Sequence, residues 1–162
     1  MELWDLFDTD GNPSGTTMVR GHAVPSGMYH LVVHLWIKNK KGEYLIQKRS
    51  KNVASMPGFW AVTTGSSVSG EDTLTTAVRE ASEELGLSVS PDDLKFVGRL
   101  RRRYDFADAY LLTLDMEEKD FILQAEEVDE VRWVTDSELM SMVASGIFHN
   151  YGPDYFKRML NS

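Results

Sequence analysis

Short runs of apolar residues, separated by turn-forming residues, predict a series of strands in the first part of the chain. A turn-rich stretch at residues 8–12, Asp-Thr-Asp-Gly-Asn, predicts the turn of an N-terminal hairpin. Two further breaks, at residues 39–42 and 57–58, predict loops. The strands expected in this part span residues 4–7, 16–20, 30–37, 44–47 and 60–63.

Apolar side chains then recur every three or four residues, which is the spacing of one face of a helix. The helix is expected from about Thr73 to Leu85. Gly86 ends it, because glycine readily takes the left-handed conformation at a helix C-terminus. The residues of the apolar stripe are Leu74, Ala77, Val78, Ala81 and Leu85.

The last third of the chain combines both spacings. The elements expected there are strands at residues 96–103, 110–116 and 131–134, a helix that Asp136 or Ser137 could cap and that ends near Gly146, and a short helix at residues 154–160. Strands mixed with two or three helices predict a layered α/β fold. A chain of 162 residues that is 42% hydrophobic is large enough to bury a core, so a single domain over residues 1–162 is expected.

Four glutamates lie on or just before the first predicted helix: Glu71, Glu80, Glu83 and Glu84. The last three fall within about 100° of one another around the helix axis. Like charges at this spacing repel each other weakly. A divalent cation bound by carboxylate oxygens would turn that repulsion into attraction. The cluster therefore predicts a metal site, and the alternative is an ordinary solvated helix face.

The residues around these glutamates form a specific pattern over residues 65–87: Gly-x5-Glu-x7-Arg-Glu-Ala-x-Glu-Glu-x-Gly-Leu. Most of its positions allow one residue type, so a chance match is rare, roughly one in 10⁸ per window. The pattern matches the signature box of the Nudix hydrolases without a mismatch, and the chain resembles that family. The resemblance implies a Nudix-type α/β/α sandwich with a mixed sheet, to which the N-terminal β-hairpin, residues 1–27, is an extension.

The resemblance also implies a site for Mg²⁺, for which Mn²⁺ would substitute. In the family the paired glutamates are metal ligands, which implies Glu83 and Glu84, and the glutamate after the arginine, Glu80, binds metal or orients water. Glu71 would complete the site. Gly65 would bring its carbonyl close to the metal, or would only form a bend. Magnesium suits this chemistry because it prefers oxygen ligands and can neutralise phosphoryl oxygens.

Arg79 and three acidic residues are the candidates for catalytic roles beyond metal binding. Arg79 lies one helical turn before Glu83 and could hold its carboxylate in place, or could form a surface ion pair of little energetic value. Glu127 occupies the place of a catalytic glutamate in some family members, although solvation of a loop is the alternative. Asp108 and Glu80 are the other candidates for the general base.

Upstream of the box, a second set of segments carries a more local resemblance. These segments are residues 29–36, 47–50 and 57–60, and they look like the branch of the family that includes type I isopentenyl-diphosphate isomerases. His30 matches a metal-binding histidine of those isomerases. Their catalytic cysteine falls near Thr64, and this chain contains no cysteine. Because a hydroxyl is far less acidic than a thiol, the resemblance indicates shared ancestry rather than shared chemistry.

A few residues outside the box could contact the substrate. Arg101 and Arg103 would share one face of a strand and could hold phosphate, or could form a charged edge that discourages aggregation. Trp60 could stack on a base or fill the core. His30 could touch metal or substrate, or be hydrogen-bonded within the sheet. Asp108 could reach the same cleft from a strand.

Charge and composition narrow the range of partners. A net charge of −8 argues against a nucleic-acid polymer, so a small-molecule diphosphate is the expected substrate. No apolar run approaches membrane-spanning length, and the absence of cysteine fits a reducing cytoplasm. The hairpin offers a free strand edge that could pair in a homodimer.

The sequence thus predicts a Mg²⁺-dependent hydrolase that cleaves a diphosphate bond in a nucleoside-diphosphate-linked or related substrate. Two alternatives are an isoprenoid-diphosphate isomerase-like protein and a non-catalytic ligand-binding Nudix domain. The missing cysteine argues against the first alternative, and the undamaged box argues against the second.

Overall fold

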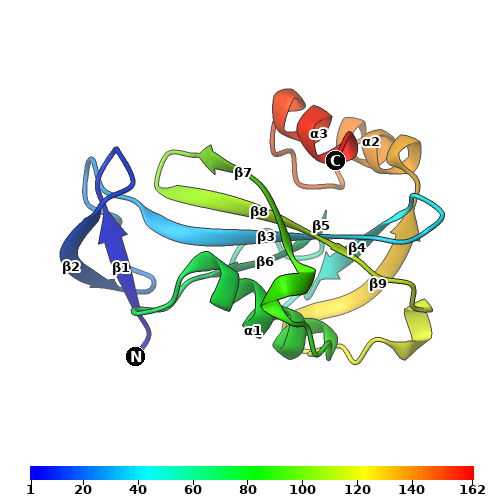
Figure 1. Ribbon diagram of the computed structural model, residues 1–162, viewed down its shortest axis with the longest axis horizontal. Coiled ribbons are helices and arrows are strands. Elements are labelled where there is room, and N and C mark those ends of the chain that lie inside the picture. Colours follow the sequence, from blue (N-terminus) through cyan, green and yellow to red (C-terminus); the bar gives the residue numbers. More distant parts are fainter.

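In the computed structural model, which describes residues 1–162, helices cover both faces of a central mixed sheet (Figure 1). Helix α1 lies on one face, and α2 and α3 lie on the other. The elements are β1 (Leu3–Phe7), β2 (Pro13–Val19), β3 (His30–Lys38), β4 (Tyr44–Arg49), β5 (Trp60–Ala61), β6 (Thr63–Ser66), α1 (Thr73–Leu85), β7 (Lys95–Arg101), β8 (Asp105–Thr113), β9 (Val128–Val134), α2 (Asp136–Ala144) and α3 (Pro153–Leu160). The predicted α/β/α sandwich is therefore confirmed. None of the helices is both long and apolar enough to cross a membrane.

Strand β3 lies at the centre of the sheet and pairs with different strands along its two edges. One edge pairs with β8 in parallel along the whole strand. The other edge pairs with β6 over residues 32–35, but with β4 only where Lys38 lies opposite Tyr44. Strand β4 continues the sheet through its own pairs with β5 and β9. Strands β6 and β4 therefore diverge along β3.

The two faces of β3 bury two separate cores. Successive side chains of a strand point to opposite faces, so a strand covered on both sides is apolar throughout. Val33, Leu35 and Ile37 pack with α1 in one core. Trp36 packs on the other side with residues of α2 and α3, among them Tyr155. This division places α1 and α3 on opposite sides of any site built along β3.

Helix α1 begins and ends at the predicted residues. Asp72 caps its N-terminus by accepting a hydrogen bond from the Thr75 N–H, and Gly86 ends it in the left-handed conformation with φ 68°. Helix α2 differs in one detail from the prediction. Its N-cap is Thr135, which forms a capping box with Glu138, rather than Asp136 or Ser137.

Strand β8 begins at Asp105, not at residue 110 as predicted, and β7 already ends at Arg101. The early start depends on two polar residues of β8 whose charges are compensated. Asp105 pairs with Arg102, and Asp108 pairs with Arg99. Carboxylates paired in this way can lie within a buried strand, which a hydrophobic pattern alone does not indicate.

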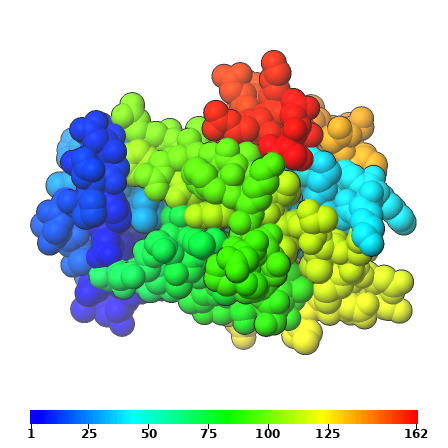
Figure 2. Space-filling model, in the orientation of Figure 1, coloured from blue at the N-terminus to red at the C-terminus, as the bar shows by residue number.

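Strands β1 and β2 form a separate two-stranded antiparallel sheet at one end of the molecule (Figures 1 and 2). The hairpin contacts the rest of the chain through an isolated bridge between Phe7 and Tyr29. The Asp5 carboxylate also accepts hydrogen bonds from the Ser69 hydroxyl (2.6 Å) and the Gly70 N–H (2.8 Å). These bonds tie the hairpin to the loop that leads into α1.

Candidate active site

A cavity of about 410 Å³ opens where β6 and β4 diverge, and it is lined by the hairpin, β3, β6, α1 and the segment before β9. The cavity walls include seven of the residues predicted from the sequence: His30, Gly65, Arg79, Glu80, Glu83, Glu84 and Glu127. Five other predicted residues do not line it: Trp60, Glu71, Arg101, Arg103 and Asp108. The fold therefore brings the C-terminal half of the box and Glu127 to one place.

Two of the three helix glutamates are buried at the cavity, which sets them apart from a solvated helix face. Glu80 is 9% exposed and Glu84 is 7% exposed, whereas about half of the Glu83 side chain is open to solvent. Gly65 makes room for Glu80, because a Cβ at this position would collide with the Glu80 carboxyl group. We refer to Glu80, Glu83 and Glu84 as the carboxylate cluster.

Burial makes the ionised form of the two inner glutamates unfavourable. Burial raises the pKa of Glu80 to about 7, with Arg79 opposing and Glu83 reinforcing the shift. Burial likewise raises the pKa of Glu84 to about 8, although a hydrogen bond from Gln47 opposes it. A nearby cation would favour the charged forms and lower both pKa values.

The donor set of the carboxylate cluster fits a hard divalent cation. All its donors are oxygens, and Gln47 contacts only one oxygen of Glu84. The three carboxylates line one cavity, but no three His, Asp or Glu side chains converge into a ready-made metal centre. The cluster therefore offers carboxylate oxygens at the place where the box predicts them, with Glu80 and Glu83 paired to Arg79.

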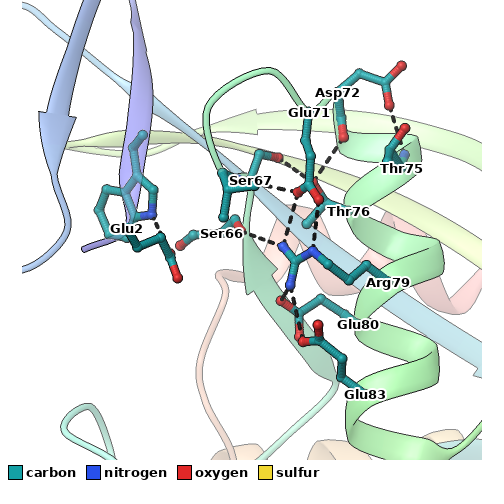
Figure 3. A network of polar contacts seen from close by, with 12 residues as sticks. Glu2, Ser66, Ser67, Glu71, Asp72, Thr75, Thr76, Arg79, Glu80 and Glu83 are labelled. Atoms are coloured by element: carbon teal, nitrogen blue, oxygen red, sulfur yellow. Dashed lines mark hydrogen bonds and ion pairs between the residues drawn. The ribbon is translucent and has the colours of Figure 1, made fainter.

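Arg79 joins the parts of the box into one network (Figure 3). Its guanidinium donates to both oxygens of Glu71, at 2.9 and 3.0 Å, and to the Ser66 carbonyl at 3.2 Å. It also donates to Glu80 at 3.0 Å and to Glu83 at 3.2 Å. An arginine with this many partners holds the carboxylates in fixed positions, unlike an isolated surface ion pair.

Glu71 is occupied by these contacts. Besides the two bonds from Arg79, one of its oxygens accepts from the Thr76 hydroxyl at 3.0 Å and from the Val68 N–H at 3.3 Å. Hydrogen bonds from Arg79 and its neighbours lower the pKa of Glu71 against the opposing effect of burial. In this structure Glu71 orients Arg79, and its role as a metal ligand stays a prediction.

Gln47 supports the carboxylate cluster from β4, and sequence reasoning did not identify it. Its amide nitrogen donates to Glu84 Oε2 at 2.9 Å, and its amide oxygen accepts from the Thr63 hydroxyl at 2.8 Å. The local signal for it is a polar residue that directly follows the buried apolar run Tyr-Leu-Ile in β4. Gln47 is 2% exposed, so this chain of bonds fixes the orientation of the Glu84 carboxyl group.

Glu127 reaches the same cavity from the other direction. It lies in the turn just before β9, where its backbone carbonyl accepts from the Ser50 N–H at 2.9 Å. Its negative charge contributes to the raised pKa values of Glu80 and Glu84, so the three carboxyl groups are electrostatic neighbours. The Glu127 side chain has no hydrogen-bond partner within the protein, which leaves it available as a base.

Asp108 lies outside the cavity, which corrects the expectation that it reaches the cleft. Both of its oxygens accept from Arg99, at 2.6 and 2.9 Å, and one also accepts from the Thr73 hydroxyl at 2.6 Å. The side chain is 4% exposed. A carboxylate with all these partners links β8 to β7 and α1, and it is not free to accept a proton from water.

The arginine predictions are also corrected. Strand β7 ends at Arg101, so the alternation that would place Arg101 and Arg103 on one face stops there. Arg103 lies over the Tyr104 ring, at 5.0 Å. Arg102 lines the cavity instead, held by two hydrogen bonds to Asp105 at 2.7 and 2.9 Å.

Trp60 belongs to the core on the α3 side of the sheet, is 7% exposed and does not line the cavity, which favours the core-filling alternative. His30 does line the cavity, and its ring stacks on Trp4 of the hairpin with 4.0 Å between ring centroids. Trp4 in turn donates to Glu2 at 2.9 Å. The hairpin is thus part of the cavity wall.

Other cavity residues were not predicted: His34, Arg49, Arg102, His149 and Tyr151. No motif marks them. They come from β3, β4, the turn between β7 and β8, and the loop between α2 and α3, and only the fold brings them together.

Comparisons with known proteins agree with this geometry. The NUDIX domain model matches residues 28–150. A Nudix hydrolase of Listeria innocua is 38% identical over 93% of this chain and 90% of its own length. An isopentenyl-diphosphate Delta-isomerase of Corynebacterium diphtheriae is 27% identical over 91% of this chain and 86% of its own. The crystal structure of DR0079 from Deinococcus radiodurans has the same fold, with a TM-score of 0.80, 21% identity and coverage of 99% of this chain and 98% of that one.

Proposed function

Because the chain belongs to the Nudix domain family, we propose that it is a Mg²⁺-dependent hydrolase that cleaves a diphosphate bond in a nucleoside-diphosphate-linked or related small molecule. The observation that supports this most directly is the buried carboxylate cluster at the cavity. Burial of two carboxyl groups without a compensating cation is unfavourable, and proteins keep such groups mainly where they bind metals or do chemistry.

Glu80, Glu83 and Glu84 are the side chains that would hold Mg²⁺, or Mn²⁺ in its place, and Gly65 would add its carbonyl. The bound ion would neutralise phosphoryl oxygens of the diphosphate. Arg79 keeps Glu80 and Glu83 in place through its guanidinium, and Glu71 keeps Arg79 in place.

Glu127 is the proposed general base. Its carboxylate lines the cavity opposite α1 and has no hydrogen bond within the protein, so it can accept a proton from an attacking water. Glu80 is the second candidate, because its buried carboxyl group lines the same cavity. Asp108 is not proposed, because Arg99 and Thr73 occupy its oxygens.

Isomerase chemistry is not supported by the cavity, despite the similarity to isopentenyl-diphosphate isomerases. Thr64 lines the wall where those enzymes are expected to carry a cysteine, and the chain contains no cysteine. A threonine hydroxyl is too weak an acid to replace a thiol in proton transfer to and from carbon.

The experiment is a substrate panel of nucleoside di- and triphosphates, nucleotide sugars and dinucleotides, each incubated with Mg²⁺, with Mn²⁺ or with a chelator. We expect metal-dependent release of phosphate-containing products from at least one member, with both products identified by mass. Turnover that continues in the chelator, or no turnover of any member, would contradict the proposal. Incubation with isopentenyl diphosphate tests the isomerase alternative, for which no allylic isomer is expected.

A further inference from the structure

The cavity extends around β6 to the side of the sheet that faces α3. His34 lies opposite Thr64 across the β3–β6 pair, whereas Val33 lies opposite Gly65. Because alternate residues of a strand point to opposite faces, the His34 side chain points away from α1. The rings of His34, His149 and Tyr151 form this part of the lining, and we call them the histidine–tyrosine wall.

The hydrogen bonds of His34 determine which of its nitrogens carries the proton. The Tyr155 hydroxyl accepts a hydrogen bond from the Trp36 indole N–H at 2.9 Å and lies 2.7 Å from His34 Nδ1. An indole nitrogen can only donate, so the Tyr155 proton must go to the one remaining partner, His34 Nδ1. His34 is therefore protonated at Nε2. The one side-chain hydrogen bond of His34 is at Nδ1, so Nε2 is left without a partner in the protein, on a residue that lines the cavity.

Tyr151 presents a second unpartnered group beside His34. Its ring packs 4.7 Å from the His34 ring and 4.3 Å from the His149 ring, and the residue is 7% exposed. Its hydroxyl makes no hydrogen bond of good geometry. The Val62 backbone N–H is close enough to lower the Tyr151 pKa, but an N–H can only donate, so it offers no acceptor for the phenol proton. A buried polar group left in this state indicates a partner outside the chain.

The histidine–tyrosine wall is uncharged at neutral pH. Burial lowers the pKa of His34 and His149, and Arg102 lowers both further. Burial raises the pKa of Tyr151. The two bonds between Arg102 and Asp105 compensate the charge of that arginine. The wall thus differs from the carboxylate cluster, where three acidic side chains share one arginine, Arg79, which pairs with Glu80 and Glu83.

We propose that the histidine–tyrosine wall binds an uncharged hydrogen-bond acceptor, a carbonyl or hydroxyl oxygen, in the part of the substrate attached to the diphosphate. His34 Nε2–H is the donor, and Tyr155 is the positioning residue that keeps the proton on that nitrogen. This assignment rests on the proposed function, because it assumes that the diphosphate binds at the carboxylate cluster.

A selectivity follows from this assignment. A hydrocarbon group in this part of the cavity would displace water from His34 and Tyr151 without replacing the lost hydrogen bonds, which is unfavourable. The wall therefore favours binding of polar head groups, such as those of nucleotide sugars, over isoprenoid chains. It does not affect the affinity for purely inorganic phosphate chains.

The first test needs neither substrate nor turnover. The ¹⁵N resonances of the His34 imidazole distinguish a protonated from an unprotonated nitrogen. In the unaltered protein we expect Nε2 protonated and Nδ1 unprotonated, and in Tyr155→Phe a change in that balance. Tyr44→Phe is the matched control, because the Tyr44 hydroxyl also bonds to the end of α3, at the Leu160 carbonyl, without touching His34. A proton found on Nδ1 in the unaltered protein overturns the proposal.

The second test measures affinity by calorimetry with Ca²⁺ in place of Mg²⁺, using ADP-ribose, UDP-glucose, dimethylallyl diphosphate and inorganic tripolyphosphate. We expect at least one of the two nucleotide ligands to bind about tenfold more tightly than dimethylallyl diphosphate. Tyr155→Phe should weaken that ligand roughly five- to tenfold and leave tripolyphosphate unchanged, and Tyr44→Phe should change neither.

Equal affinity for polar and hydrocarbon ligands overturns the proposal. So does a Tyr155→Phe variant that weakens all ligands equally or none. Because binding and the histidine resonances are read without hydrolysis, a failure of the proposed enzyme activity would be visible separately, as an absence of products in the substrate panel.

Discussion

The carboxylate cluster and the histidine–tyrosine wall line the same cavity, and they differ in both origin and charge. The cluster comes from one helix, within residues 80–84, and holds buried carboxyl groups with raised pKa values. The wall is assembled from β3 and the loop before α3, and its groups are neutral. A cation would stabilise the ionised form of the first side, whereas burial keeps the second side neutral. A cavity built in this way can separate phosphate binding from recognition of the attached group.

The largest expected effect comes from removing one charge of the carboxylate cluster. Glu84→Gln preserves shape and can still contact Gln47, but loses an anionic oxygen ligand. We expect kcat/KM for the best panel substrate to fall by at least about 100-fold. Steady-state kinetics with titrated Mg²⁺ measure this. The control is Glu126→Gln, an exposed glutamate outside the cavity, which should stay near the unaltered rate. Equal rates for both variants would show that the cluster does not act through its charge.

Gly65→Ala tests whether the carboxylate cluster also needs the space that the missing side chain of Gly65 leaves for Glu80. The new Cβ would collide with the Glu80 carboxyl group, so that side chain must move. We expect a loss of about 1 to 3 kcal/mol of stability, as for other overpacked sites, and a loss of roughly tenfold or more in activity. Denaturant unfolding and kinetics measure the two effects. Ser66→Ala is the control, since only the Ser66 backbone carbonyl is used, by Arg79. Unchanged activity in Gly65→Ala would show that catalysis does not depend on the position of the Glu80 carboxyl group.

A smaller effect should appear as a pH dependence of stability without metal. Burial raises the pKa of Glu80 to about 7 and that of Glu84 to about 8, above their usual value of 4.5. The folded protein therefore holds more protons than the unfolded chain between about pH 4.5 and 8, and its stability falls as pH rises through that window. We expect the melting temperature to fall by several degrees in a chelator and by less with Mg²⁺.

A double variant that carries Glu80→Gln and Glu84→Gln is the control for this pH dependence of stability. The double variant removes both titrating groups, so its melting temperature in the chelator should vary less over the same pH range. If the unaltered protein instead became more stable as pH rose toward 8, the raised pKa values would be contradicted.

The smallest effect on activity is expected at Asp108. Asp108→Asn weakens the buried contacts to Arg99 and Thr73, which should cost roughly 1 to 3 kcal/mol of stability. Because Asp108 does not line the cavity, kcat should stay within about twofold of the unaltered value, as for substitutions away from an active site. Thermal unfolding and kinetics at a temperature where the variant is folded measure both. A large fall in kcat under conditions where Asp108→Asn is fully folded would make Asp108 a candidate for the general base again.

Local physical rules predicted much of the fold. Helix α1 was predicted with its correct bounds because its period, its N-cap and its terminal glycine all lie within one short segment. Strand β8 was placed too late, because Asp105 and Asp108 look like loop residues until their partners Arg102 and Arg99 are known. That error in the strand also produced the error at Arg101 and Arg103. A shifted strand boundary changes which side chains share a face.

The sequence by itself determined the carboxylate cluster, since one helix with a known period places Glu80, Glu83 and Glu84 together without help from the rest of the chain. Only the tertiary structure decided what faces that cluster. Glu127 approaches it from the turn before β9 and Gln47 from β4, and the bond between His34 and Tyr155 joins residues that are far apart in the chain. Contacts of that range depend on how whole strands pair and helices pack, and no local pattern of residue types records them.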